Sequence, residues 1–325
     1  MPESLYPESL YYDVFNGDAD GICALHQLRL AEPRQARLLT GVKRDIRLLD
    51  RIVEVRNGVL TVLDISLDSN RAALQELLPT CRVFYVDHHY AGEIPASANL
   101  VAHIDPDPEQ CTSLIVDNLL RGRYRSWAVV AAFGDNLHGP ALRAAAGLGL
   151  SEKETAALRE LGELMNYNGY GERIEDLHLA PQDLYAAVQP HGDPFSFCAE
   201  SDIPAMLRDG FTDDLRRARG MAPEEETAQG RIFRFPAEKW ARRVAGVFSN
   251  EKAREMPDKA HALLVANSDN TFMVSVRAPL SRRQGADALC RAFAGGGRAA
   301  AAGINTLPAE QVALFCRAFH ERFSP

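Results

Sequence analysis

Short hydrophobic runs alternate with longer amphipathic stretches along the first half of the chain. Runs of this kind, bounded by polar and turn-forming residues, are typical of buried strands, and the stretches between them have the apolar spacing of helices. Strands that alternate with helices imply crossover connections, so we predict an α/β domain around a parallel sheet. The expected strands lie at 11–16, 36–41, 59–65, 82–87 and 99–104, and the expected helices at about 20–31, 44–55 and 69–78.

The pattern becomes helical from about residue 110 to residue 190. Cys111-Thr112-Ser113 is a typical helix start, and Ser151 to Glu154 has the residues of a capping box. These helices complete the first domain, which we place at 1–188.

A stretch rich in proline, glycine and acidic residues follows at 189–230. Such a composition favours irregular structure, so we predict a linker with room for one short helix. A second, smaller α/β domain is expected at 231–325, because strand and helix patterns resume there. Its expected strands lie at 231–235, 261–266, 272–277 and 300–306, and its expected helices at 238–254, 285–293 and 309–323.

The composition is that of a globular protein with two domains. A chain of 325 residues is long enough for two hydrophobic cores. Its six cysteines are scattered without a C-x-x-C pair, and no signal-peptide pattern is present, which predicts a reduced, cytoplasmic protein. No apolar run reaches the roughly 18 residues of a membrane-spanning helix. The formal net charge of −8 disfavours binding along long nucleic acid, which requires a basic face.

Acidic motifs follow three of the expected strands. Asn16-Gly17-Asp18-Ala19-Asp20-Gly21 follows the first strand, Asp64 ends the third, and Asp87-His88-His89 closes the fourth. A further aspartate, Asp135, lies in the helical region. The carboxyl ends of parallel strands meet at the edge of an open sheet where ligands bind, so we expect these motifs to converge.

The residue types in these motifs favour a metal centre. Carboxylates with imidazole form a hard ligand set that suits Mn²⁺ or Mg²⁺. Asp18 and Asp20, two residues apart, can reach adjacent ions from one loop. Two divalent ions roughly 3.5–4 Å apart can share a hydroxide, direct it at phosphorus and stabilise the phosphoryl oxygens. The motifs therefore predict hydrolysis of a phosphate ester, with a metal-activated water as the nucleophile.

Each motif also has an ordinary structural interpretation. An Asp-x-Asp-Gly sequence after a strand is frequently only a turn, and Asp64 alone suits a helix N-cap. A histidine pair at a strand end can be merely solvated, and Asp135 can be a surface charge. The order and spacing of the motifs along the strand ends favour a joint site over these separate interpretations.

Together, Asn16–Gly21, Asp64, Asp87–His89 and Asp135 resemble the four motifs of the DHH phosphoesterase superfamily, which includes oligoribonucleases and single-strand exonucleases. Gly295-Gly296-Gly297-Arg298 resembles the glycine signature of the associated C-terminal domain. The resemblance covers nearly the whole chain. It implies an N-terminal parallel-sheet catalytic domain and a smaller α/β substrate-binding domain, with the active-site cleft between them. It also implies five metal ligands, namely Asp18, Asp20, Asp64, His88 and Asp135.

The same resemblance gives roles to further residues. His89 would face the substrate phosphate, and Asp87 would orient an imidazole through a hydrogen bond. A glycine triplet before alanines also suits a flexible turn into a packed strand, and Arg277 suits an ordinary surface position. The residues implied in substrate binding, through exposed backbone N–H groups or permanent charge, are Arg277, Gly295, Gly296, Gly297 and Arg298.

The chain departs from the family pattern at two places. Val14 and Asn16 stand where the superfamily often carries a histidine or a further aspartate, so we expect a weaker first metal site or one completed by His103 or His138. Arg298 stands where the glycine signature more commonly ends in histidine, although arginine keeps the donor function.

We therefore expect a divalent-metal-dependent phosphoesterase, with two Mn²⁺ or Mg²⁺ ions, acting on a phosphodiester or phosphomonoester of a short oligonucleotide or nucleotide. An exopolyphosphatase or a cyclic-dinucleotide phosphodiesterase is the alternative enzyme. The contrasting class is a non-catalytic nucleotide-binding module with a degenerate metal site. No membrane and no long nucleic acid is expected as a partner, and a homodimer stays open.

Overall fold

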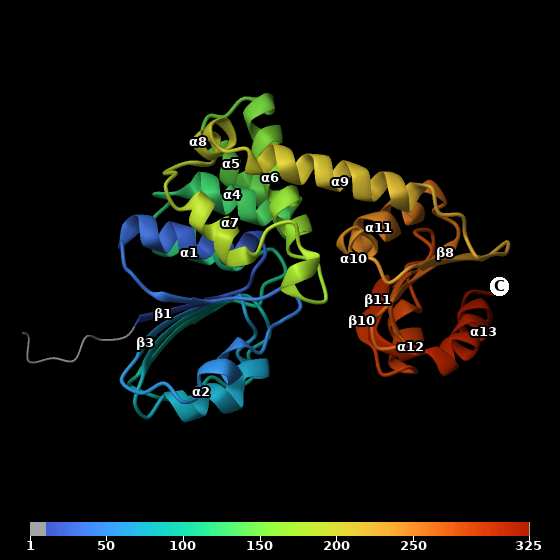
Figure 1. Cartoon of the computed structure of the whole chain (residues 1–325), viewed down its shortest axis with the longest axis horizontal. Coiled ribbons are helices and arrows are strands. Elements are labelled where there is room, and N and C mark those ends of the chain that lie inside the picture. The colour runs from blue at the N-terminus through green and yellow to red at the C-terminus, as the bar shows by residue number, and fades with distance from the viewer. Residues whose placement is uncertain (1–10, 325) are drawn as a thin grey trace, which may run out of the picture. The chain divides into compact units, whose positions relative to one another are not determined.

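The computed structural model describes residues 11–324, so residues 1–10 of the expected first domain and residue 325 of the second lie outside it. The chain divides into two compact units, and the boundary along the sequence lies between Arg208 and Asp209 (Figure 1). Each unit contains its own sheet and its own hydrophobic core.

The first unit is built on a five-stranded parallel sheet, as the sequence predicts. The strand order is β2-β1-β3-β4-β5, and every pairing is parallel. The central strands read as continuous apolar runs because both faces of the sheet are covered. The strands are β1 (Tyr11–Phe15), β2 (Arg37–Leu39), β3 (Val59–Leu63), β4 (Arg82–Asp87) and β5 (Leu100–Ile104).

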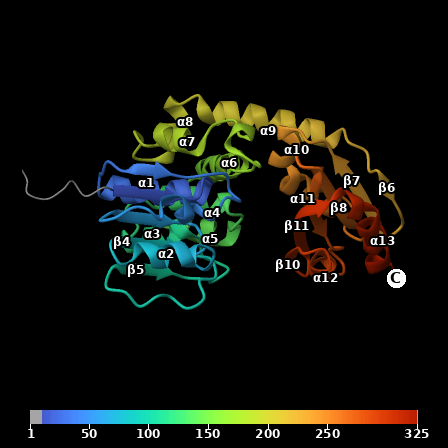
Figure 2. The same ribbon diagram turned by 60° about the horizontal axis from the view of Figure 1, so that its bottom comes forward.

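Helices cover both faces of this sheet (Figures 1 and 2). Phe15 of β1 packs into the core under α1, whereas Tyr12 and Val14 pack into the core under α2. The helices of the first face include α1 (Ala19–Ala31), α3 (Thr112–Leu119), α4 (Arg125–Gly134), α6 (Glu152–Asn168) and α7 (Pro181–Val188), and those of the second are α2 (Arg71–Leu77) with the 3-10 turns η1 (Leu48–Ile52) and η2 (Asp68–Asn70). The remaining elements of the unit are α5 (His138–Ala146), η3 (Ile174–Asp176) and α8 (Pro194–Glu200).

The helix expected at about 44–55 is only the short 3-10 turn η1, so this prediction was wrong. The side chain of Asn70 binds two backbone groups of the segment: its Oδ1 accepts from the Leu49 amide at 3.1 Å, and its Nδ2 donates to the Ile46 carbonyl at 2.6 Å. These bonds occupy groups that an α-helix would use internally.

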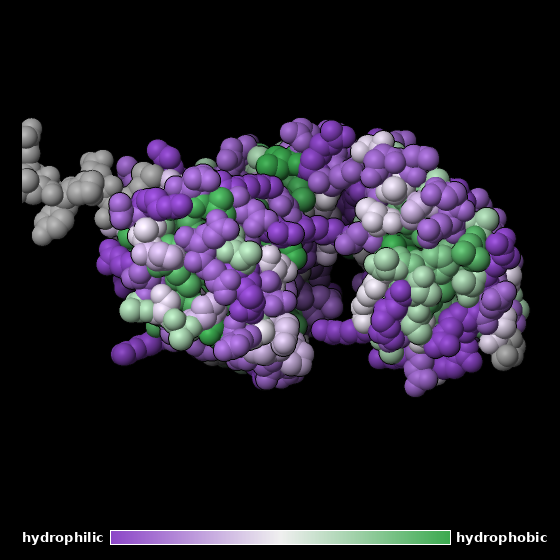
Figure 3. All heavy atoms as spheres, turned by 90° about the horizontal axis from the view of Figure 1, so that it is seen from below, coloured by the Kyte–Doolittle hydropathy of each residue, from purple (hydrophilic) through white to green (hydrophobic). Residues whose placement is uncertain are grey.

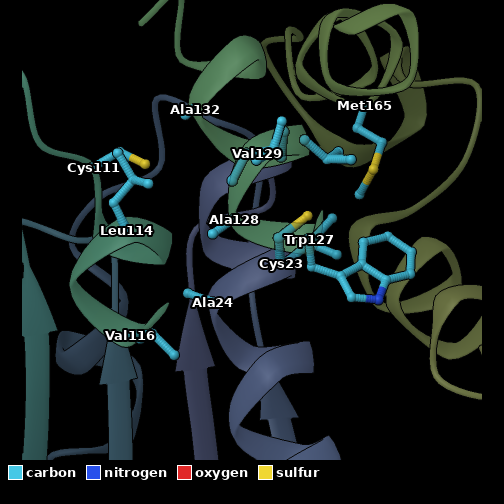
Figure 4. Packing of buried hydrophobic residues seen from close by; sticks show 14 of the residues in the cluster. Cys23, Ala24, Cys111, Leu114, Val116, Trp127, Ala128, Val129, Ala132 and Met165 are labelled. Carbon is cyan, nitrogen blue, oxygen red and sulfur yellow. The ribbon is translucent and has the colours of Figure 1, made fainter. Parts of the chain in front are cut away.

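Small residues allow α1, α4 and α6 to approach closely. A Cβ at Gly134 of α4 would lie 2.5 Å from the Cβ of Ala19 and 2.8 Å from the carbonyl of Gly162. Figure 4 shows Cys23 and Ala24 of α1 beside Ala128 of α4 in the same core. This packing fixes the end of α4, and therefore Asp135, against the start of α1.

The expected irregular linker at 189–230 is largely helical, so this prediction was also wrong. It contains α8 and the seventeen-residue helix α9 (Ile203–Arg219). Pro194 is the first residue of α8 and Pro204 the second of α9, positions whose N–H groups have no partner within a helix, so proline is tolerated there. The change between the two units falls within α9, at Arg208 and Asp209.

The second unit is a smaller α/β domain, as predicted. Its sheet has the order β10-β11-β9-β8-β7-β6, and only β7 and β8 pair in parallel. The expected helix at 238–254 is divided at Val244 into α10 (Lys239–Arg243) and α11 (Ala245–Glu255). The other elements are β6 (Glu225–Glu226), β7 (Gly230–Phe235), β8 (Ala260–Ala266), β9 (Thr271–Arg277), α12 (Ala286–Arg291), β10 (Gly296–Arg298), β11 (Ala301–Pro308), the 3-10 turn η4 (Ala309–Gln311) and α13 (Val312–Phe323).

The surface is mixed in character. Figure 3 shows hydrophilic residues over most of the visible face of the first unit, and a group of hydrophobic residues on the visible face of the second. Within residues 11–324, no helix combines the length and the apolar character needed to cross a bilayer.

Candidate metal centre

The strand order of the first unit creates a position where side chains from several motifs meet. From β1 the chain crosses to β2 on one side, and it then returns to β3 on the other side of β1. Ligands of open α/β sheets bind at such a switch point, beyond the carboxyl ends of the strands. Asp18 follows β1, Asp64 follows β3, and His88 follows β4 at this edge.

Asp18 and Asp20 are held by the first turns of two helices. Asp18 caps α1, and its Oδ1 accepts from the backbone N–H groups of Asp20 and Gly21 at 3.0 and 3.2 Å. The carboxylate of Asp20 accepts from the first N–H groups of α3, those of Thr112 and Ser113, both at 2.7 Å. Helix N-termini stabilise negative charge, so these N–H groups offset part of the cost of burying the two carboxylates.

Asp64 lies between these helices and the histidine motif. Its φ of 59° places it in the left-handed region, which non-glycine residues seldom adopt. The Asp64 carboxylate accepts a hydrogen bond from the Thr112 hydroxyl at 3.1 Å. Strain of this kind persists only where the surrounding structure holds it, and it is concentrated at functional sites.

His88 joins three of these carboxylates. Its Nε2 lies 3.5 Å from Asp64 Oδ1, 3.6 Å from Asp135 Oδ2 and 4.0 Å from Asp20 Oδ2. Ligand atoms about 2.1 Å from a shared octahedral ion lie about 3 Å apart when adjacent and about 4.2 Å apart when opposite. His88 Nε2 therefore lies at the spacing of ligands that share an ion from one oxygen of each of the three carboxylates.

Lys43 is a member of the site that the sequence motifs do not reveal. Its Nζ donates to Asp18 Oδ2 at 2.5 Å, to Asn166 Oδ1 at 2.8 Å and to Asp135 Oδ1 at 3.3 Å. Lys43 lies in the loop after β2, and its residue type and spacing match none of the acidic motifs. Only the folded chain brings it to the carboxylates.

The carboxyl groups of the cluster differ in their pKa. Burial raises the pKa of Asp64 well above its ordinary value, and repulsion from Asp20 and Asp18 raises it further. Burial also raises the pKa of Asp20. Burial alone would raise the pKa of Asp18, but attraction to Lys43 and hydrogen bonds lower it below its ordinary value. The side of the cluster away from Lys43 thus lacks compensating positive charge.

Burial disfavours the ammonium form of Lys43, yet its pKa is raised well above the ordinary value by attraction to Asp18, Tyr170 and Asp135 and by its hydrogen bond to Asp18. The side chain is 22% exposed. Lys43 therefore enters the site as a cation.

Asp87 and His89 form a second pair beside the cluster. Asp87 is fully buried, and His89 Nδ1 donates to its Oδ1 at 2.7 Å. Burial lowers the pKa of His89, but the hydrogen bond and the charge of Asp87 outweigh it and raise that pKa above the ordinary value. The sequence predicts that Asp87 orients an imidazole, and in the structure this imidazole is that of His89.

The three residues considered as completing ligands lie in different surroundings. Asn16 is buried next to the cluster, with its Nδ2 donating to the backbone carbonyl of Lys43 at 3.2 Å. His103 packs its ring against Phe84, and His138 bonds to Asn136. Neither of these histidines belongs to the metal-ligand groups found in residues 11–324, which are Asp64 with His88 and His89, and Asp20 with His88 and Asp135.

The last three residues of the glycine signature form an edge strand, β10, where the sequence also suited a flexible turn. A Cβ at Gly295 would meet the Gly303 carbonyl at 2.4 Å, and Gly297 has a φ of 138°, so both positions require glycine for packing or conformation. Only Gly296 of the three faces open space. Close packing and backbone conformation therefore account for two of the three glycines.

Arg277 and Arg298 lie on one face of the second sheet. Ala301 pairs with Arg298 on one side and with Arg277 on the other, and directly paired residues point to the same face. Arg298 is exposed, whereas Arg277 Nε donates to Asn250 Oδ1 at 2.7 Å. The sheet thus presents two guanidinium groups on either side of a small residue.

The donor set of the first unit fits a divalent metal ion. Its oxygens and one imidazole nitrogen are hard ligands, and the ligand atoms lie within 4.8 Å of one another in each group. The buried oxygens Asn16 Oδ1 and Asp87 Oδ2 have no hydrogen-bond partner among the described residues. This cluster of carboxylates thus has the ligands and the charge to hold Mn²⁺ or Mg²⁺.

Comparisons with known proteins identify the class of fold. No family model and no curated protein matches the sequence. Among solved structures, the DHH domain of a member of the s1p family of ribosomal proteins aligns with a TM-score of 0.62 and 12% identity over 96% of this chain and 86% of that one. The exonuclease RecJ bound to manganese aligns with a TM-score of 0.60 and 15% identity, over 98% and 96% of the two chains.

A pGpG-specific phosphodiesterase from Vibrio cholerae, PggH, aligns with a TM-score of 0.53 and 14% identity over 95% of this chain and 98% of that one. The chain therefore has the fold of the DHH-domain proteins, as its motifs predict. Because the identities are low, these alignments establish the fold, and the chemistry rests on the residues of the site.

Proposed function

We propose that the protein is a divalent-metal-dependent phosphoesterase that hydrolyses a phosphodiester or phosphomonoester of a short oligonucleotide or nucleotide. The observation that carries the proposal is the position of His88 Nε2, within 4.0 Å of carboxylate oxygens from Asp20, Asp64 and Asp135 at the switch point of the sheet. Such a cluster is costly unless a cation compensates it.

Asp20, Asp64, His88 and Asp135 would hold the metal ion. When bound, Mn²⁺ or Mg²⁺ supplies Lewis acidity toward a phosphoryl oxygen and lowers the pKa of a coordinated water. Asp18 lies beside these ligands, and its hydrogen bonds with the first turn of α1 and with Lys43 hold its carboxylate in place.

His89 would bind and orient the substrate phosphate. Its ring is 43% exposed, and Asp87 occupies its Nδ1, so Nε2 is the remaining donor. The raised pKa keeps this imidazole protonated to a higher pH than usual. Hydrogen bonds from a cationic donor to a phosphate oxygen are among the stronger ones, so His89 suits a substrate with a dianionic or monoanionic phosphate.

In the second unit, we propose that Arg277 and Arg298 bind a phosphate or the base-bearing end of the substrate. Their register on either side of Ala301 supports this role, because two guanidinium groups can each form a charge-assisted contact. RecJ is an exonuclease and PggH a phosphodiesterase, which also supports a nucleotide substrate. We place the activity in the cytoplasm, since all six cysteines are free, as a reducing compartment leaves them.

The first test is release of mononucleotide from a labelled dinucleotide in the presence of Mn²⁺. We expect hydrolysis by the wild type and a loss of at least about 100-fold in Asp64→Asn, because a preorganised charge contact of this kind contributes on that order. Asp258→Asn, an exposed aspartate of the second unit, is the control and should retain full activity.

Other substrates distinguish the alternatives. Polyphosphate and a cyclic dinucleotide should be hydrolysed more slowly than the dinucleotide. Faster phosphate release from polyphosphate, or faster opening of the cyclic dinucleotide, would replace the proposed substrate class and keep the phosphoesterase.

A non-catalytic nucleotide-binding module is the second candidate, and one observation favours it. Lys43 already compensates part of the acidic cluster without any metal. Nucleotide binding at equilibrium, together with no hydrolysis of any of the three substrates with Mn²⁺ or Mg²⁺, would establish the module.

A further inference from the structure

Lys43 occupies a position that has the surroundings of a cation-binding site. Three oxygen atoms from three separate elements approach its Nζ: Asp18 Oδ2 at 2.5 Å, Asn166 Oδ1 at 2.8 Å and Asp135 Oδ1 at 3.3 Å. The ring of Tyr170 lies beside the same ammonium, with its centroid at 5.7 Å. Carboxylate and amide oxygens are also the ligands that a divalent ion prefers.

The backbone of Lys43 is anchored next to this position. Its N–H donates to the Gly169 carbonyl at 2.8 Å, and its carbonyl accepts from Asn16 Nδ2 at 3.2 Å. Gly169 in turn lies against Asp18, since a Cβ there would be 3.1 Å from the Asp18 Cβ. The ammonium is thus held from both ends, by its backbone bonds and by its three oxygen partners.

Asn16 connects this arrangement with the unusual first motif. An aspartate at this position could ligate a metal ion, but it could not donate a hydrogen bond to the carbonyl of Lys43. Because the Asn16 amide donates that bond, asparagine at this position removes a charged metal ligand and also anchors the loop that carries Lys43.

We propose that the Lys43 ammonium takes the place of one of two metal ions, so that the centre binds a single divalent cation through Asp20, Asp64, His88 and Asp135. This inference rests on the proposed function, in which the centre holds a divalent cation. It replaces the expected pair of ions with one ion and one fixed protein charge.

The geometry makes the lysine and a second ion mutually exclusive. A divalent ion between Asp18 and Asp135 would need the oxygens that Nζ already contacts. A divalent ion bound to the same oxygens as the Lys43 ammonium would also be strongly repelled by it in this buried site. In the single-ion centre, the ammonium keeps its three N–H groups on Asp18, Asn166 and Asp135 and acts toward a phosphoryl oxygen as a fixed positive charge.

The stoichiometry of Mn²⁺ tests the inference without any measurement of activity. Metal-free protein is dialysed against excess Mn²⁺, and bound ions per chain are counted by native mass spectrometry and by electron paramagnetic resonance. We expect one ion per wild-type chain, with the spectrum of an isolated Mn²⁺. Two ions with an exchange-coupled spectrum would overturn the inference and leave the metal-dependent phosphoesterase standing.

Variants sharpen the result. Lys43→Met with Asn16→Asp removes the ammonium and restores a carboxylate, so we expect two ions and a coupled spectrum. Lys43→Arg keeps a cation and should bind one ion, and the exposed Lys153→Met should behave as the wild type. If the double variant fails to fold, the wild-type count still decides the matter. No bound ion in the wild type would overturn both this inference and the proposed function.

Discussion

Asp64 occupies a position whose burial, backbone conformation and neighbouring charges are unfavourable for folding. It is buried, it has a left-handed backbone, and its neighbours Asp18 and Asp20 are carboxylates. Each of these conditions disfavours a charged residue at this position. Aspartate is tolerated in the left-handed region better than most residues, which explains how the chain maintains it.

His26 makes stability depend on pH at a position away from the metal cluster. It lies on α1, packs edge-on against Trp127 and donates from Nε2 to the His191 carbonyl at 2.7 Å. Burial lowers its pKa from 6.5 to about 4. Between these two values the unfolded chain binds a proton that the folded chain does not, so stability falls as the pH falls through this window.

When the pH falls from 7.5 to 5, we therefore expect the free energy of unfolding of the wild type to decrease by about 2 kcal/mol more than that of His26→Gln. Glutamine keeps a donor for the His191 carbonyl without the titrating group. Urea unfolding at the two pH values measures the difference, and the partly exposed His138→Gln serves as the control. An equal pH dependence in His26→Gln and the wild type would contradict the assignment.

At the scale of elements, the contact between α1 and α4 positions the proposed metal ligands. Gly134 is the last residue of α4, directly before Asp135, and it lies against Ala19, between the two motif-one aspartates. The small size of these residues is thus a condition for the geometry of the centre.

Gly134→Ala should destabilise the protein by about 1–3 kcal/mol, because the new methyl group has no space beside Ala19 and Gly162. It should also weaken Mn²⁺ binding, since the end of α4 must shift. Denaturant unfolding and calorimetric titration give the two quantities. Gly139→Ala on α5, where only the flexible end of Arg143 is near at 3.4 Å, should change neither. A fully stable Gly134→Ala would show that the helices can separate at no cost.

The sequence predicts most elements of this fold for identifiable reasons. Buried parallel strands such as β3 and β4 give continuous apolar runs, and each ends in a motif. Proline and glycine were misleading in α9, because Pro204 lies in its first turn and Gly210 is carried within seventeen helical residues. The sequence pattern could not show that proline here begins a helix.

The candidate site likewise contains residues that the sequence reveals and one that it does not. Asp18, Asp20, Asp64 and His88 are recognisable because they follow strands whose ends converge. Lys43 is not, since its contacts with Asn166 and Asp135 span 123 and 92 residues of sequence. Contacts of this range follow from tertiary packing and leave no local signal.

At the scale of the whole molecule, each unit has its own core. Phe15 and Trp127 belong to the first, and Phe315 and Phe319 to the second, all with 0% exposure. The proposed metal ligands all belong to the first unit. Units with separate cores need not unfold in one cooperative step.

We expect calorimetry to resolve two unfolding transitions, only one of which shifts to higher temperature with Mn²⁺, because a ligand stabilises the part that binds it. Phe315→Ala should lower the other transition, with a loss of about 3–5 kcal/mol in the second unit. A single transition that responds to both the metal and Phe315→Ala would mean that the units unfold together.

The ammonium of Lys43 among the carboxylates also bears on how the proposed centre responds to a low concentration of free metal. Unlike a bound ion, a charge that belongs to the chain is not lost on chelation or dilution. Occupancy of a centre that needs one ion falls about tenfold when scarce free metal falls tenfold, whereas occupancy of a centre that needs two falls about a hundredfold. If Lys43 takes the place of one ion as proposed, the centre would stay occupied at free-metal concentrations too low for a centre that needs two ions.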